Sequence, residues 1–263
     1  MNDSYIRSIN RVVDYIQTHL DSDLPLKKLS KIACFSGFHF SRIFKTGMKE
    51  TLHQFIRRLR LEKAAGLLLT NKEKSITEIA LTCGFATSAS FAKSFKNHFK
   101  MSASLWRKRS NDLFDKNSTP VQIENGKISI TQGSPMWTFQ REDSIRQVVV
   151  KNVPVTKIAY IRNVGPYEGD ENLFENLYQK LFKWAAPREL IDEKIFTLNI
   201  YHDNPEITEN KNLRVMVAIP IPDDVKPTGP VGVTNISGGR YGTCRFLLNE
   251  DEFGDAWGWM SSV

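Results

Sequence analysis

The sequence predicts a multidomain chain in which an all-α domain with two helix-turn-helix units precedes an α+β domain. Three observations lead to this expectation. A helical pattern of apolar residues occurs twice, at 26–45 and at 76–96. Basic residues outnumber acidic ones only in the first part of the chain. After residue 143 the pattern changes to β-like runs separated by single helices. We therefore expect a first domain over 1–110, a linker over 111–143 and a second domain over 144–263.

The repeated pattern is the most specific feature of the first domain. LKKLSKIACFSGFHFSRIFK aligns with ITEIALTCGFATSASFAKSFK, and only the second copy has a glycine, Gly84, at its turn. The matched positions include Leu29 with Ile79, Phe35 with Phe85, Phe40 with Phe91, and Arg42 with Lys93. The apolar positions repeat while the residues between them differ. This indicates a shared scaffold that presents two different surfaces.

Helical spacing and capping residues give the expected elements of this domain. An amphipathic helix over 4–20 follows the candidate caps Asn2, Asp3 and Ser4. The first helix pair covers 26–33 and 37–45, with Ser36 capping its second member. A long helix over 51–69, capped by Thr51, would hold the two units at a fixed separation. The second pair covers 76–82 and 88–99, and a short helix over 102–109 closes the domain.

The charge of the chain is divided unevenly. Residues 1–110 contain 20 Lys and Arg against 8 Asp and Glu, a net charge of +12, whereas residues 111–263 contain 16 against 21, a net charge of −5. A concentration of positive charge attracts a polyanion and releases its counterions, which favours nucleic acid as the partner. The alternative is a basic surface that is merely solvated.

Other residue patterns argue against catalysis, metals and membranes. The three cysteines include no CxxC pair, which fits a reducing cytoplasm. The five histidines lack metal-ligand spacing, and the sequence contains no nucleophile elbow, phosphate loop or HExxH motif. We expect no enzyme, no cofactor, no catalytic residue and no metal site. No apolar run approaches the roughly 18–20 residues of a membrane span, and the N-terminus lacks a signal-peptide core, so we expect a cytoplasmic protein.

The second domain reads as a β-α-β-β repeat. Strands are expected over 148–162, interrupted by Pro154, and over 195–201 and 213–219, with a helix over 170–185. A strand over 239–248 and a helix over 250–260 begin a second copy, which we expect to be incomplete because the sequence ends at Val263. Within the linker, a short hairpin over 121–124 and 127–131 is expected around Asn125–Gly126.

The first 110 residues resemble the DNA-binding domain of AraC/XylS-type transcription regulators. The resemblance rests on the paired units, the linking helix, and the run IALTCGFATSASFAKSFKNHFKMSASLWRK, which contains GF–x5–F–x3–FK–x2–F. It departs from the family at Cys34, where a turn glycine is common, at Leu52 and Ala103, where prolines are common, and at Trp106, where tyrosine is usual. The resemblance implies double-stranded promoter DNA as a partner and allows RNA polymerase as a second one.

In a helix-turn-helix the second helix lies in the major groove, and its first residues meet base edges. Arg42 is the strongest candidate for base recognition, because a guanidinium can bond guanine O6 and N7 together. The charged side chains of Lys45, Lys96, His98 and the Arg57–Arg58–Arg60 cluster are expected at phosphates or simply at the surface. Phe38 could pack on a thymine methyl. The phenylalanines expected in the core are Phe35, Phe40, Phe44, Phe85, Phe91, Phe95 and Phe99. The full set of candidate DNA-binding residues is Ser36, Gly37, Phe38, Ser41, Arg42, Lys45, Thr87, Ser88, Ala89, Ser90, Lys93 and Lys96.

Residues from about 145 onward resemble a gyrase-inhibitor-like effector-binding domain. The matching stretches are IAYIRNVGPYEG, LYQKLFKWA, LNIYHDNPEIT, LRVMVAIPIPDDV and GGRYGTCRFLLNEDEFGDAWGWM. The resemblance implies a small-molecule effector. An aromatic cleft would suit a flat or cationic molecule. Its candidate lining residues, which are core residues in the alternative interpretation, are Tyr160, Tyr167, Trp184, Tyr201 and Trp257.

Two other functions for the second domain stay open at this point. Some relatives of this domain hydrolyse small molecules with a glutamate as base, for which Glu175 is a candidate here. The family's pocket carboxylate cannot be carried over, because it lies near strands beyond the end of this sequence. The domain could instead serve only for dimerisation or protein contact. The leading hypothesis is a sequence-specific DNA-binding transcription regulator that responds to a small molecule.

Overall fold

The computed structural model describes residues 2–108, 122–124, 127–129, 148–167, 169–192 and 195–246, together with positions 248, 252, 256 and 259. The chain divides into two compact units. The larger unit combines Met1–Asn117 with Lys157–Thr234, and the smaller unit combines Ser118–Thr156 with Asn235–Val263. The first part of the chain therefore forms one unit with most of the α+β segment.

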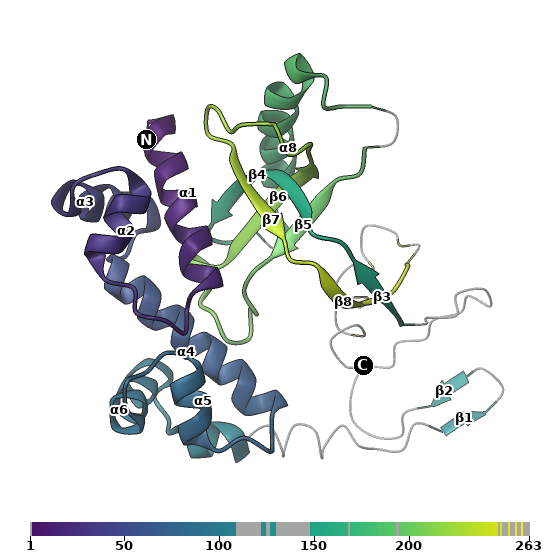
Figure 1. Cartoon of the computed structure of the whole chain (residues 1–263). Coiled ribbons are helices and arrows are strands. Elements are labelled where there is room, and N and C mark those ends of the chain that lie inside the picture. The colour runs from purple at the N-terminus through teal and green to yellow at the C-terminus, as the bar shows by residue number, and fades with distance from the viewer. Residues whose placement is uncertain are drawn as a thin grey trace. The chain divides into compact units, whose positions relative to one another are not determined.

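Helices α1 to α6 occupy the first 100 residues of the larger unit (Figure 1). Their bounds are Asp3–Thr18 for α1, Leu26–Ala33 for α2, Gly37–Met48 for α3, Leu52–Thr70 for α4, Ile76–Thr82 for α5 and Ser88–Phe99 for α6. Residues 103–108 are also helical. The predicted order of helices is confirmed. The boundaries differ most in α3, which continues one turn further than expected.

Side-chain caps explain where α1, α3 and α4 begin. The Asn2 side chain accepts a hydrogen bond from the backbone of Ser4 at 3.0 Å, and Ser36 accepts one from His39 at 3.4 Å. Thr51 and Gln54 cap each other reciprocally at the start of α4. Each cap satisfies a backbone N–H that the first helical turn leaves unpaired. The predicted caps Asn2, Ser36 and Thr51 are confirmed.

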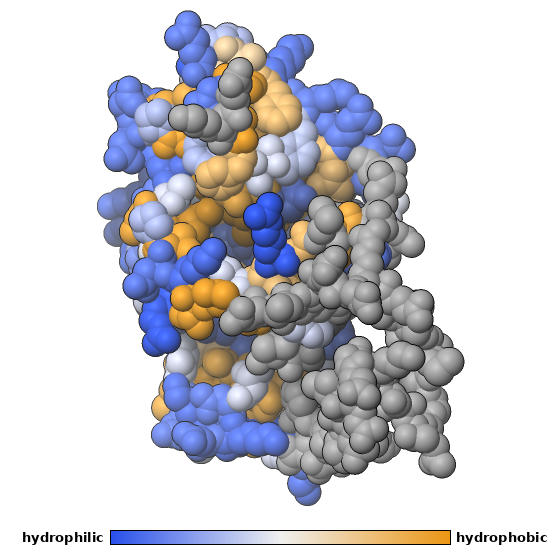
Figure 2. Space-filling model, turned by 90° about the vertical axis from the view of Figure 1, so that its right-hand side faces the viewer, coloured by the Kyte–Doolittle hydropathy of each residue, from blue (hydrophilic) through white to orange (hydrophobic). Residues whose placement is uncertain are grey.

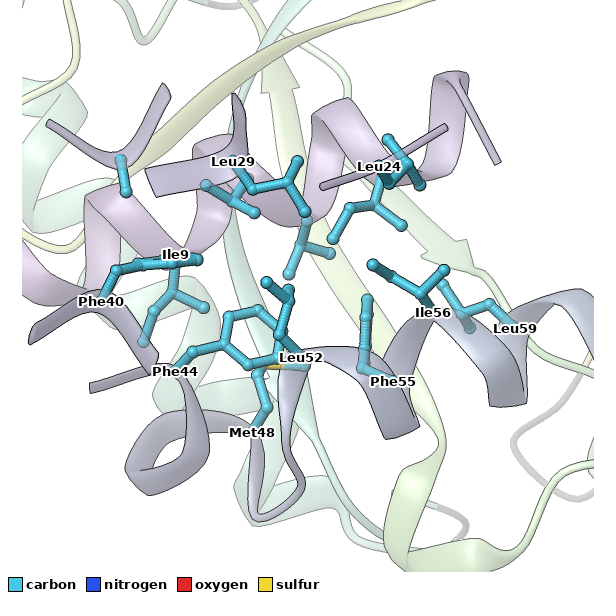
Figure 3. Close-up of a cluster of buried hydrophobic side chains, with 14 of the residues drawn as sticks. Ile9, Leu24, Leu29, Phe40, Phe44, Met48, Leu52, Phe55, Ile56 and Leu59 are labelled. Atoms are coloured by element: carbon cyan, nitrogen blue, oxygen red, sulfur yellow. The ribbon is translucent and has the colours of Figure 1, made fainter. Parts of the chain in front are cut away.

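Two hydrophobic clusters lie along the helices, and α4 contributes to both. The first cluster contains residues of α1, α2, α3 and the first half of α4, and Phe55 is fully buried in it (Figure 3). The second joins the later half of α4, including Leu61 and Ala65, to α5 and α6. A single helix that is buried in both cores fixes the separation between the two helix-turn-helix units. This confirms the role expected for the long helix.

A four-stranded sheet completes the larger unit, with the strand order β5-β6-β4-β7. The bounds are Thr156–Val164 for β4, Leu198–Tyr201 for β5, Arg214–Pro220 for β6 and Gly232–Ile236 for β7, with helix α8 at Glu171–Ala185. Strand β6 pairs antiparallel with both β4 and β5. The β-α-β-β order β4-α8-β5-β6 confirms the predicted unit, whereas β7 was not predicted.

The sheet buries different chemistry on its two faces. Ala159 and Ile161 of β4, together with Val217 of β6, pack against Leu177 and Leu181 of α8. Because side chains alternate along a strand, the residues between them point to the opposite face. That face carries Tyr160 and Arg162 of β4, which bond to Asn10 and Asp14 of α1.

The smaller unit contains two separate strand pairs. Strand β1 (Gln122–Glu124) pairs antiparallel with β2 (Lys127–Ser129), which confirms the predicted hairpin strands. Strand β3 (Val149–Val153) pairs antiparallel with β8 (Gly239–Thr243). The break after β3 confirms the expected interruption at Pro154, and β8 is shorter than predicted. The helix expected over 250–260 falls mostly outside the described residues.

The surface view in Figure 2 shows hydrophobic residues as separate patches among hydrophilic ones on the coloured part of that face. No helix in the described part of the chain combines the length and the apolarity that a membrane crossing requires.

Candidate nucleic-acid interface

The start of α3 presents an exposed aromatic residue beside an exposed arginine. Phe38 is 77% exposed, and the Arg42 guanidinium lies 5.9 Å from the centre of its ring. The Ser41 hydroxyl donates to the Gly37 carbonyl at 2.9 Å, so its hydrogen is already used within the helix. Phe38 and Arg42 therefore lie side by side on the exposed face at the start of α3.

The start of α6 carries smaller side chains. The predicted residues of this helix are all exposed, and they are Thr87, Ser88, Ala89, Ser90, Lys93 and Lys96. Thr87 caps the helix by accepting from the Ser90 backbone at 3.1 Å, and the Ser90 hydroxyl donates back to the Thr87 carbonyl at 2.9 Å. Thr87 therefore helps to fix the start of α6. Among the described residues, the side chains of Ser88 and Lys93 make no hydrogen bond of this kind.

The turn of each helix-turn-helix unit contains a residue with positive φ, and this residue differs between the two units. Cys34 adopts a left-handed conformation with φ of 60°, at the position where the related family often has glycine. In the second turn Gly84 has φ of 85°. A Cβ atom on Gly84 would lie 2.7 Å from the Leu20 carbonyl oxygen and 2.8 Å from Nε of Arg60. The second turn therefore needs glycine for space as well as for backbone conformation.

Arg60 is a structural residue rather than a free phosphate ligand. Its guanidinium donates to the backbone carbonyls of Leu20 at 2.9 Å and Ser22 at 2.7 Å. These bonds connect α4 to the turn that follows α1. The prediction that Arg60 lies free at a phosphate or surface position was wrong.

Arg58 was also assigned wrongly from the sequence. Its side chain is 6% exposed and pairs with Glu50 at 2.5 Å and with Glu62 at 3.0 Å. The Arg58 guanidinium also lies 5.3 Å from the centre of the Phe55 ring. The periodicity of α4 could have placed Arg58 on the buried face, because it comes three residues after Phe55. Arg57 is exposed, and a phosphate contact by its side chain stays a prediction.

Lysines predicted at the surface are exposed, whereas His98, also predicted there, is partly buried. Lys45 and Lys96 are exposed. His98 is partly buried against the ring of Phe99, and burial lowers its pKa, so a charged contact with phosphate is disfavoured at neutral pH. Of the predicted core phenylalanines, Phe40, Phe44, Phe91 and Phe95 are fully buried, and Phe35, Phe85 and Phe99 are partly buried against the two clusters.

Only some of the candidate effector-binding aromatics come together. The rings of Tyr167 and Tyr201 lie 5.3 Å apart, and Tyr201 is 36% exposed. Tyr160 is fully buried, and Trp184 donates from its indole nitrogen to the Thr228 hydroxyl at 2.9 Å. Trp257 lies outside the described residues. The structure therefore pairs two of the predicted aromatics and places two others in hydrogen-bonded positions elsewhere.

Comparison with known proteins finds two family models that match separate parts of the chain. A model described as a helix-turn-helix domain matches residues 29–109, and a model described as a GyrI-like small molecule binding domain matches residues 146–263. The chain joins an AraC-type helix-turn-helix domain to a GyrI-like domain.

The relatives of the AraC-type domain are regulators from several bacteria. An uncharacterized HTH-type transcriptional regulator of Staphylococcus aureus (strain COL), SACOL0084, is 42% identical over 91 residues, which are 35% of this chain and 12% of that protein. The probable transcriptional regulator LumQ of Photobacterium leiognathi is 31% identical over 99 residues, covering 37% of this chain and 40% of LumQ. The chain therefore spans less than half the length of either relative.

Solved structures match the same region. An AraC-type regulator from Chromobacterium violaceum has 23% identity and a TM-score of 0.37, covering 43% of this chain and 94% of that structure. The C-terminal domain of AraT from Geobacillus stearothermophilus has 31% identity and a TM-score of 0.37, covering 39% of this chain and 84% of that structure.

Sequence reasoning missed the polar residues that connect the AraC-type helices to the sheet of the GyrI-like domain. Arg162 of β4 donates to Asn10 at 2.9 Å and to Asp14 at 2.5 Å, both on α1. Gln17 of α1 lies 3.1 Å from Nδ1 of His202. An arginine within an otherwise apolar strand was the available signal, but its partner lies 148 residues away.

Neither domain offers a metal site within the described ranges. No group of three or more His, Cys, Asp and Glu side chains there lies close enough to hold an ion.

Glu175, the candidate base for hydrolysis, accepts a hydrogen bond from Gln179 at 3.0 Å on α8. It lines a surface hollow of about 410 Å³ with Tyr178 and Phe182.

Proposed function

We propose that the chain is a cytoplasmic, sequence-specific transcription regulator that binds double-stranded promoter DNA through α3 and α6 and responds to a small molecule. The observation that carries the proposal is the pair of capped helices with exposed first turns, held by one shared helix, α4. They belong to the part of the chain with a net charge of +12. The bacterial transcriptional regulators that are similar to this helix-turn-helix domain support the same function.

Each recognition helix has a different chemistry for DNA. Arg42 can donate two bonds to one guanine, and Phe38 beside it can pack on a thymine methyl. Lys93 supplies a flexible point charge among serine and alanine side chains. Two such helices on one chain favour an asymmetric site with half-sites about 34 Å apart, read by one protein molecule.

The effector is assigned to the GyrI-like domain, whose description as a small-molecule-binding domain supports it. The neighbouring rings of Tyr167 and Tyr201 suit a flat or cationic ligand. We assign no catalytic residue. RNA polymerase is the further protein partner that a transcription regulator of this kind requires when it activates.

Selection from a random duplex library with the full chain tests the proposal. We expect enrichment of one asymmetric sequence. Its affinity, measured by fluorescence anisotropy, should fall by a factor of about 10³ or more between roughly 50 and 200 mM salt. Lys151→Ala, an exposed change in β3, serves as the control and should bind like the parent. Binding without sequence preference and without salt dependence would exclude the proposal.

A further inference from the structure

A cavity of about 540 Å³ lies within the larger unit, lined by the ends of α1 and α4 and by the segment that joins β5 to β6. Leu59 and Leu67 of α4 and Ile207 of the joining segment supply apolar surface. Arg214, His202 and Glu62 supply polar groups. This site is separate from the neighbouring rings of Tyr167 and Tyr201, which do not line it.

Arg214 brings an unused hydrogen-bond donor to this cavity. The residue is 3% exposed, and its Nε and Nη2 atoms donate to Asp203 at 2.9 Å and 2.5 Å. Its third nitrogen, Nη1, is buried and has no partner among the described residues. A buried donor left without an acceptor costs about 1–3 kcal/mol, and more when the group is charged. Buried polar groups in native proteins are therefore nearly always satisfied.

His202 brings a second unused donor. The amide nitrogen of Gln17 lies 3.1 Å from Nδ1 of His202, so Nδ1 accepts and the ring hydrogen resides on Nε2. Nε2 is buried and has no partner in the described part of the chain. Burial, together with the nearby charges of Arg162 and Arg214, lowers the pKa of His202 to about 3, so the ring is neutral at physiological pH.

The two donors are neighbours across the β5–β6 ladder. The backbone of His202 donates to the Arg214 carbonyl at 3.1 Å, directly after the pair Tyr201 and Val215. Residues that face each other across antiparallel strands project to the same side, with Cβ atoms about 5 Å apart. Two adjacent N–H donors on one side of the ladder match the two oxygens of a carboxylate.

The local charges permit an anion. Asp203 is already paired with Arg214, and Glu62 is already paired with Arg58. Burial raises the pKa of Glu62 to about 7, so its negative charge is partly neutralised at physiological pH. Lys63, which is exposed at the rim, adds a positive charge.

We propose that this cavity binds a small organic anion whose carboxylate accepts hydrogen bonds from Arg214 Nη1 and His202 Nε2 while its apolar body lies against Leu59 and Leu67. The site goes beyond the proposed effector cleft and does not depend on DNA binding. It adjoins α4, the helix that supports both recognition helices.

Gly66 of α4 provides a variant that fills the cavity without disturbing the donors. It lines the cavity, and a Cβ atom added there would meet no atom within 4 Å. Gly66→Trp should therefore occupy the space of the ligand, whereas Gly66→Ala is the matched control that leaves the space open.

The test uses the full chain without DNA and four probes: hexanoate and phenylacetate, and the matched amines hexylamine and phenethylamine. Calorimetry should give saturable one-site binding for at least one carboxylate, at least tenfold tighter than its amine. Gly66→Trp should weaken it tenfold or more, and Gly66→Ala should leave it within about twofold. Equal or tighter binding of the amines, or binding that Gly66→Trp leaves unchanged, would overturn the proposal.

A second measurement does not depend on any variant. In protein labelled with nitrogen-15, the Nε2–H resonance of His202 should shift in proportion to the carboxylate bound. An unchanged His202 resonance at saturating carboxylate would show that ordered water alone satisfies these donors, and would also overturn the proposal. Because DNA is absent from both measurements, either result leaves the proposed DNA binding untouched.

Discussion

Asp14 of α1 bonds to two residues of β4 with its two carboxylate oxygens. One oxygen accepts from Nη2 of Arg162 at 2.5 Å, and the other accepts from the Tyr160 hydroxyl at 2.6 Å. The Arg162 side chain is 3% exposed, and its guanidinium lies 5.0 Å from the centre of the Tyr160 ring. Burial raises the pKa of Tyr160, so its hydroxyl stays a donor. The first helix of the AraC-type domain is thereby bonded to the sheet through a buried charge pair.

Asp14→Ala should destabilise the larger unit strongly. The substitution leaves the Arg162 charge buried without its carboxylate, and breaking a buried pair in this way costs about 3–5 kcal/mol. Urea unfolding followed by circular dichroism should show this loss. Glu73→Ala, an exposed change in the turn after α4, is the control and should stay within about 0.5 kcal/mol of the parent. A small effect of Asp14→Ala would mean that water replaces the carboxylate at Arg162.

The helical half of the fold could be predicted closely from the sequence because its signals are local. Ser36 and Thr51 mark helix starts by capping, and the spacing of Phe40 and Phe44 marks a buried face within one helix. The strand β7 was missed because Gly232 and Asn235 weaken a strand pattern, and its pairing comes from residues far away in sequence.

Long-range polar contacts account for most of what the sequence could not predict at the candidate sites. Arg58 is an exception, because its partner Glu62 lies one turn away and Phe55 marks the same buried face of α4 locally. Arg162 and Arg214 pair with residues that only the tertiary fold brings near. The exposure of Phe38, a candidate DNA contact, was easier to predict, because the motif itself fixes which helix face stays exposed.

Two glycines of the AraC-type domain should respond in opposite directions to alanine. Gly84→Ala introduces a Cβ atom at φ of 85° and within 2.8 Å of Arg60, which should cost about 1–3 kcal/mol. Gly66→Ala adds a methyl group in open space inside α4 and should stabilise by about 0.5–1 kcal/mol through helix propensity. Thermal unfolding of both variants checks this. Equal effects would mean that Arg60 moves away from the turn freely.

Glu62 should make stability depend on pH in a defined direction. Burial raises the pKa of this carboxyl from 4.5 to about 7, Arg58 opposes the rise, and Asp203 adds to it. The folded state then holds a proton that the unfolded state releases between about pH 4.5 and 7, so this contribution is present below pH 4.5 and is lost as the pH rises through 7.

Glu62→Gln should remove that contribution. The difference in unfolding free energy between variant and parent should change by roughly 1–3 kcal/mol in favour of the variant from pH 5 to pH 8. Because burial lowers the pKa of His202, this residue makes the stability of both proteins rise with pH below 6.5. That contribution is the same in parent and variant and cancels in the difference. A constant difference across this range would contradict burial as the cause of the raised pKa of Glu62.

The matched positions Arg42 and Lys93 should separate specificity from affinity. Both side chains are exposed on their recognition helices, but only the guanidinium can bond guanine O6 and N7 together. Arg42→Ala should weaken binding to the selected duplex by about 1–3 kcal/mol while changing affinity for random duplex much less, because its contact depends on one base pair. Lys93→Ala should weaken both duplexes by similar factors and reduce the salt slope by about one, as expected for a lost phosphate contact. Anisotropy titrations of both variants on both duplexes measure all four quantities. Within each variant, a fault in folding would weaken binding to both duplexes alike, because it lowers the amount of active protein, whereas a selective loss on the selected duplex points to the substituted side chain.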